Sequence, residues 1–161
     1  MEHVDRYLTL RKINNFIGNQ LKNIGKYENL YIDGANKLIY PCVIIKIFPI
    51  GIDYNYVSSE KRTRRIGVDI TYKNKSDNLD LMDNGDWLEA LFSKGVNCGE
   101  FGYLSITRPS SNIIPIDVNS TQKELHFTFN IHFDDVVPII INEDTHIEPV
   151  PLENLYTKID Y

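Results

Sequence analysis

The stretch that decides the fold is Leu125-His126-Phe127-Thr128-Phe129-Asn130-Ile131-His132-Phe133. A large apolar side chain occupies every odd position, and a polar side chain occupies every even one. Because successive side chains of a strand point to opposite faces of its sheet, this alternation predicts a strand with one buried and one solvated face. Strands of this kind belong mostly to antiparallel sheets.

Similar signals predict further strands outward from this one. β-Branched residues are dense over residues 38–48, where both faces are apolar and either parity is compatible with a core. Pro49 and Gly51 disturb this ladder, and residues 52–57 are expected to be its frayed continuation. Apolar and polar residues alternate over residues 66–72. Shorter strands are predicted at residues 30–32, 103–107 and 113–118.

Two segments have helical spacing instead. Over residues 4–24 the apolar positions recur every three or four residues, and Gly25 supplies a typical helix end. These apolar positions are Leu10, Ile13, Ile17, Leu21 and Ile24. A second helix is predicted to begin at a cap formed by Asp77 or Asn78 and to end near Gly95.

These elements predict an α+β fold: a mainly antiparallel or mixed β-sheet with the two helices packed on one face. One domain is expected over residues 1–135, followed by an acidic, proline-containing extended tail over residues 136–161. The expected core is Ile13, Ile17, Leu21, Val43, Ile45, Ile47, Ile66, Val68, Ile70, Leu88, Leu91, Phe127, Phe129 and Ile131.

The composition of the chain excludes several classes of protein. The chain has 161 residues, of which 42% are hydrophobic and 24% charged, and this excludes a disordered chain. A net charge of -5 argues against a protein that binds a specific nucleic-acid sequence. The longest apolar stretch is interrupted by Lys46 and Pro49, so no membrane partner is expected.

The residues that could carry chemistry do not form a recognisable site. His126 and His132 share a strand face, but six residues of strand separate them by about 20 Å. His132 and Asp134 are nearer, yet two ligands do not make a metal centre. Gly95, Gly99 and Gly102 follow a helix rather than open one, which is typical of a helix-to-strand connection and not of a phosphate cradle. We therefore expect no catalytic residue, no cofactor and no metal.

Four basic residues are concentrated within one short segment of the chain. Lys61, Arg62, Arg64 and Arg65 are predicted to lie in a polar hairpin tip over residues 58–65. Such a tip either keeps the sheet edge solvated or contacts an acidic surface or a nucleic acid. Both interpretations stay open.

The order of the elements resembles the phage tail terminator family, including terminator-like proteins of tail operons in low-GC bacteria and their prophages. The resemblance covers about residues 4–135 and rests on an N-terminal helix followed by four local cues. These cues are the proline-started strand Tyr40-Pro41-Cys42-Val43-Ile44-Ile45-Lys46-Ile47, the strand Arg64-Arg65-Ile66-Gly67-Val68-Asp69-Ile70-Thr71-Tyr72 after a basic turn, a helix with Met82, Trp87 and Leu88, and the strand Leu125-His126-Phe127-Thr128-Phe129-Asn130-Ile131.

The resemblance implies a structural virion protein, not an enzyme, that assembles in the host cytoplasm. Its family caps the tail tube as a hexameric ring and meets a head-side connector or neck protein. In such a ring, we expect the basic segment and the extended tail to mediate subunit or tube contacts. The candidate interface residues are Lys61, Arg62, Arg64, Arg65, Ile139, Ile140, Ile141, Leu152, Leu155 and Tyr156. A disordered acidic tail is the alternative.

Three other functions remain open at this point. A head–tail connector or tail-completion subunit has a similar size and symmetry. A small ligand- or metal-binding domain would use His132, Asp134 and Asp135. A nucleic-acid module would rest on residues 61–65 alone.

Overall fold

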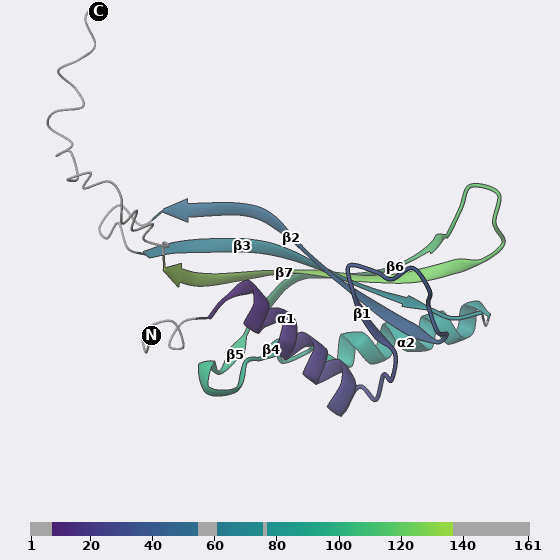
Figure 1. Cartoon of the computed structure of the whole chain (residues 1–161), viewed down its shortest axis with the longest axis horizontal. Coiled ribbons are helices and arrows are strands. Elements are labelled where there is room, and N and C mark those ends of the chain that lie inside the picture. The colour runs from purple at the N-terminus through teal and green to yellow at the C-terminus, as the bar shows by residue number, and fades with distance from the viewer. Residues whose placement is uncertain (1–7, 55–60, 76, 137–161) are drawn as a thin grey trace, which may run out of the picture.

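The computed structural model describes residues 8–54, 61–75 and 77–136. Its main layer is a five-stranded sheet with strand order β1-β2-β3-β7-β6, and a two-stranded sheet pairs β4 with β5. Both α-helices lie on one face of the large sheet, beneath it in Figure 1. The predicted α+β fold is confirmed.

The large sheet is mixed, as predicted. β1 (Leu30–Ile32) runs parallel to β2 (Cys42–Tyr54), whereas all the other neighbouring pairs of strands are antiparallel. The remaining strands are β3 (Lys61–Lys73), β4 (Val96–Asn97), β5 (Tyr103–Leu104), β6 (Ile106–Pro115) and β7 (Lys123–Val136). β3 and β7 lie in the middle, and β7 contains the alternating stretch on which the fold prediction depended.

The first helix is shorter than predicted. α1 (Leu10–Asn19) begins after Thr9, whose side-chain oxygen accepts a hydrogen bond from the Lys12 amide at 3.2 Å. The helix therefore does not include residues 8 and 9, and residues 4–7 lie outside the described part. A π-helical turn, η2 (Gln20–Ile24), continues α1. Its wider turn changes the helical phase, and Ile24 is consequently exposed rather than buried.

The second helix is close to the prediction. α2 (Asn78–Leu91) is capped by Asp77, whose carboxylate accepts a hydrogen bond from the Asp80 amide at 3.1 Å. After the helix, Gly95 adopts a φ of 94° and donates its amide to the Phe92 carbonyl at 2.8 Å. The glycine-rich connection, which includes the 3-10 turn η3 (Gly99–Phe101), then leads into β5, as expected.

The core lies between the helices and the sheet. Twelve of the predicted core side chains are buried, while Ile47 and Leu91 are partly buried and pack against the core. In β2, up to the register shift after Pro49, the odd-numbered side chains point inward, with Val43 and Ile45 in the core. Phe92 contacts Phe127 and Phe129 with ring centroids 6.0 and 5.3 Å apart, and thus ties the end of α2 to β7.

Several strand boundaries were predicted wrongly. Residues 38–41 are not part of β2, and β2 continues through an irregularity between Pro49 and Gly51 as far as Tyr54. The segment 103–107 is divided between β5 and β6, and residues 116–118 lie beyond the end of β6. β6 instead includes residues 108–112, because an edge strand tolerates Pro109 at a register shift.

The basic residues do not form a hairpin tip. Lys61, Arg62, Arg64 and Arg65 belong to β3, which pairs there with β2 on one side and β7 on the other. Residues 58–60 of the predicted tip lie outside the described residues. The basic cluster is therefore part of a central strand.

Candidate functional site

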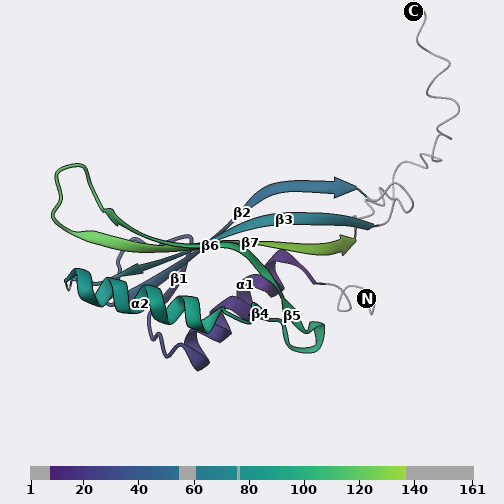
Figure 2. The ribbon, with the colours of Figure 1, turned by 180° about the vertical axis from the view of Figure 1, so that it is seen from behind.

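Three strands run past the helical layer at one end of the molecule. This region, which we call the distal half of the sheet, comprises residues 48–54 of β2, 61–67 of β3 and 132–136 of β7. It lies above the beginning of α1 in Figure 1 and extends to the left beyond it, and Figure 2 shows the same arrangement from behind. β1 pairs only with residues 43–45 of β2, and β6 pairs with β7 only up to Ile131. Among the described residues, both edges of the distal half thus lack a neighbouring strand.

Two glycines shape the outer face of the distal half, which is the face turned away from the helices. The ring of Phe48 lies over Gly67, and a Cβ atom there would be 2.3 Å from the ring. The Arg65 guanidinium lies over Gly51, 2.6 Å from where its Cβ atom would be, and approaches Asp53 with Nε 3.3 Å from Oδ2. The missing glycine side chains therefore give large side chains of adjacent strands a place on the sheet surface.

The inner face of the distal half combines apolar and basic side chains. Arg62 and Arg64 share the parity of the buried Ile66, and Arg64 pairs in register with Ile52 and Phe133. Ile52 is 40% exposed. Exposed aliphatic side chains beside arginines are typical of protein interfaces.

Only part of the predicted interface is described. Arg62, Arg64 and Arg65 do lie together on the distal half. Lys61 is in β3, but the structure describes only its backbone. The predicted tail contacts also lie outside the described residues; these are Ile139, Ile140, Ile141, Leu152, Leu155 and Tyr156.

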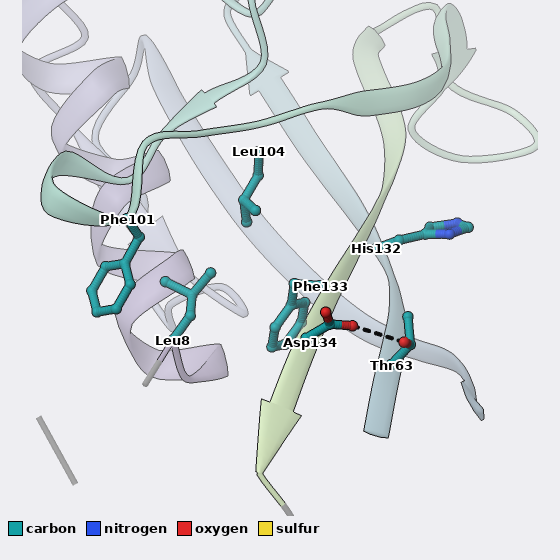
Figure 3. A pocket seen from close by; sticks show the side chains of 7 residues that line it. All are labelled: Leu8, Thr63, Phe101, Leu104, His132, Phe133 and Asp134. Atoms are coloured by element: carbon teal, nitrogen blue, oxygen red, sulfur yellow. Dashed lines mark hydrogen bonds between the residues drawn. The ribbon is translucent and has the colours of Figure 1, made fainter. Parts of the chain in front are cut away.

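A groove of about 480 Å³ opens at the edge of β7 where β6 ends (Figure 3). Leu8, Phe101 and Leu104 line it together with Phe133 of β7. On the strand, Asp134 accepts a hydrogen bond from the Thr63 hydroxyl at 2.8 Å, and His132 points away from the apolar wall (Figure 3). His132 and Asp134 thus do not converge on one point, and the groove is suited to an apolar side chain of a partner.

A polar cluster on the outer face of the sheet was missed from the sequence. Nδ1 of His126 lies 2.9 Å from Oδ2 of Asp69, and Nε2 lies 2.9 Å from Oε1 of Glu124. Glu124 also pairs with Lys73, with Nζ 2.8 Å from Oε2, and the Thr71 hydroxyl donates to Asp69. His126 is therefore not a freely solvated residue, as its place on the outer face had suggested.

The two carboxylates favour the charged imidazole. Burial by itself disfavours the charged form, but the hydrogen bonds from His126 to Asp69 and Glu124 outweigh it and raise the pKa of His126. Burial likewise opposes ionisation of Glu124, but its hydrogen bonds with Lys73 and His126 lower the pKa of Glu124. The charges of the four ionised side chains balance, so this cluster stabilises the sheet.

We expect the contribution of His126 to stability to depend on pH. The raised pKa means that its stabilisation is complete below the usual value of 6.5 and is lost as pH rises through the folded-state value. Glu124 acts in the opposite direction, because its stabilisation is lost as pH falls below the usual 4.5 and through its lowered value. Replacing His126 with Gln should therefore cost about 1 kcal/mol near pH 5.5 and less near pH 8.5.

Urea unfolding of the wild-type protein and of His126→Gln, each at pH 5.5 and pH 8.5, measures how the loss of stability changes with pH. His132→Gln is the matched control, because His132 is exposed on the same strand and should have little effect at either pH. An equal loss for His126→Gln at both pH values would contradict the charged-imidazole assignment.

The two cysteines are buried and unpaired with each other. Burial raises the pKa of Cys98 to about 11 and also raises the pKa of Cys42, so both remain thiols at neutral pH. Within the described ranges, no group of three or more His, Cys, Asp or Glu side chains is arranged to hold a metal ion. The helices described are all too short or too polar to cross a membrane.

Comparison with known proteins gives no match: neither a protein-family model nor a curated protein matches this sequence. Function therefore has to be inferred from the residues and their geometry.

Proposed function

We propose that this chain is a ring-forming structural subunit of the phage tail terminator type, which caps the tail tube and forms the joint to a head-side connector. The order of its elements supports the proposal. An N-terminal helix precedes two long adjacent strands, β2 and β3, then α2, and finally the aromatic strand β7. This is the order on which the resemblance to tail terminators is based.

The observation that carries the proposal is the distal half of the sheet. It projects past the helices and has two edges without a described neighbour, with Ile52 exposed beside its register partner Arg64 and on the face that Arg62 shares. Apolar burial supplies most of the affinity of a protein interface, and charge sets its orientation. A surface with both properties is suited to contacts with other protein subunits rather than to the chemical conversion of a small molecule.

The groove at the β7 edge adds to this interpretation. Its apolar wall of Leu8, Phe101 and Leu104 continues the distal half on the side that β6 leaves open. A partner's side chain that enters such a groove is buried from water, and a backbone segment beside it meets an edge of β7 that no described strand occupies. Both are features by which neighbouring subunits of an assembly bind.

The test uses the full chain together with a phage tail tube protein. We expect native mass spectrometry to show a hexamer, alone or on tube ends, and electron microscopy to show rings at one end of each tube. Added during tube polymerisation, the chain should shorten the tubes in proportion to its concentration. A chain that stays monomeric and leaves tube length unchanged would overturn the proposal. Binding to portal or adaptor rings, with no effect on tubes, would instead identify a head–tail connector.

A further inference from the structure

α2 has an exposed face of its own on the other side from the core. Leu81, Gly85 and Leu88 are buried on the side that faces the core, whereas Leu79 is 68% exposed and Met82 is 56% exposed. Asp83 and Asp86 are also exposed and lie on the same side of the helix as Leu79 and Met82. We call these four residues the outer face of α2.

The charge of this helix is entirely acidic. The segment from its cap to its end contains Asp77, Asp80, Asp83, Asp86 and Glu89, and it has no lysine or arginine. The inner face of the distal half has the opposite character, since Arg62 and Arg64 share it with the exposed Ile52, which pairs with Arg64. We call these three residues the distal patch. The two surfaces are complementary in charge, and each contains at least one exposed apolar side chain.

Their positions in the molecule are also complementary. The beginning of α2 lies at one end of the long axis, and the distal half of the sheet lies at the other (Figure 1). The two surfaces are therefore too far apart to meet within one chain. Two different patches at opposite ends allow copies to associate head to tail, which is the kind of interface that closes into a ring.

The layered structure explains why a helix is suited to the distal patch. α1 and α2 cover the inner face of the sheet in one half of the molecule (Figures 1 and 2). In the distal half, Leu8 and Phe101 of η3 line the groove beside the buried Phe133, and Ile52 is left 40% exposed. A sheet face is stabilised by packing against a second layer. A helix from another copy would extend the helical layer over Ile52.

We propose that the outer face of α2 in one copy packs against the distal patch of the next copy. Leu79 and Met82 contact the exposed Ile52, and Asp83 and Asp86 pair with Arg62 and Arg64. This inference rests on the proposed ring and names the contact between its subunits.

Charge reversal in the full chain tests the contact. The helix variant contains Asp83→Lys and Asp86→Lys, and the strand variant contains Arg62→Glu and Arg64→Glu. Each variant alone has like charges at every contact, so its self-association should be weaker by about tenfold or more in analytical ultracentrifugation. An equimolar mixture should recover the wild-type mass, because each copy then meets a neighbour of opposite charge. A single chain with all four substitutions should recover it as well.

Glu28→Lys with Glu100→Lys is the matched control. Both residues are exposed and lie outside α2, and the pair has the same charge change as the helix variant. Circular dichroism establishes that every variant is folded. Unchanged self-association in both reversal variants would overturn the proposed contact, as would a loss that neither the mixture nor the combined chain restores. If either of these outcomes is found but the wild-type chain still forms rings on tubes, only the proposed contact is wrong and the proposed function stands. A wild-type chain that stays monomeric with and without tubes would overturn both.

Discussion

Replacing Gly95 with alanine is expected to destabilise the protein by about 3 kcal/mol. The glycine has a φ of 94°, and a Cβ atom there would lie 2.1 Å from the carbonyl oxygen of Leu104. The atom in the way belongs to the backbone of β5, so no side-chain rotation relieves the overlap. The end of α2 or the β4–β5 pair must shift, although both are held against the core through Phe92 and Val96.

Urea unfolding followed by the fluorescence of Trp87, the single tryptophan, measures the loss. In a chain of this length the change corresponds to a melting temperature lower by roughly 10 °C. Gly99→Ala is the matched control, because Gly99 also has a positive φ, 59°, but the heavy atom nearest to its Cβ position is a ring carbon of Phe16 at an ordinary contact distance of 3.4 Å. That variant should lose only about 1 kcal/mol. Equal losses for the two glycines would show that the overlap with Leu104 has no effect.

The fold was predictable where a short-range pattern coincides with a buried face. The alternation through Phe127 and Phe129 predicts β7 because every second side chain lies against the helices. Asp77 and Gly95 marked the ends of the α2 segment, because capping and a positive φ each require particular residue types.

The same reasoning explains the errors. Beyond the helical layer, neither face of β3 is covered by a described helix, so Arg62 to Arg65 show no alternation even though they are in a strand. A polar run without alternation is typical of a turn, which is why a hairpin tip was predicted there. The π-turn at Gln20 was equally hidden, because one wider turn leaves the spacing of Ile13, Ile17 and Leu21 unchanged and displaces only Ile24.

The candidate sites depend on register, which a single sequence does not specify. The outer-face position of His126 was predictable from parity, but its contact with Asp69 requires β3 and β7 to be aligned to within one residue pair. The position of Arg64 beside Ile52 requires the same of β2 and β3. The basic cluster could therefore be recognised as a functional candidate, whereas its neighbours could not.

The second large effect is expected at Gln20, the buried side chain that links the π-turn to the end of α2. Its Nε2 donates to the carbonyl oxygens of Leu91, at 2.9 Å, and Gly95, at 3.2 Å. Its Oε1 accepts from the Asn97 amide at 3.0 Å. One side chain thus satisfies three backbone groups of the connection between α2 and β4, none of which belongs to a neighbouring residue in the sequence.

Replacing Gln20 with Leu should cost about 3 kcal/mol in the free energy of unfolding. The leucine fills a similar volume, but it leaves two carbonyl groups and one amide without this partner, at about 1 kcal/mol each. Gln122→Leu is the control, because it makes the same chemical change at an exposed position and should alter stability by less than about 0.5 kcal/mol. Similar losses for the two variants would mean that the three hydrogen bonds contribute little.

Gln20→Glu separates the hydrogen bonds from the packing. A carboxylate still accepts from Asn97, but it faces the Leu91 and Gly95 carbonyl oxygens and has no proton to donate. Burial and these oxygens disfavour its charged form, so its pKa is expected to rise in the folded state. A group of this kind destabilises the fold above its unfolded-state pKa and does so less as pH falls. The stability of Gln20→Glu relative to wild type should therefore improve between pH 7 and pH 5, while that of Gln20→Leu should not; the same pH response in both variants would contradict the hydrogen-bonding role of Gln20.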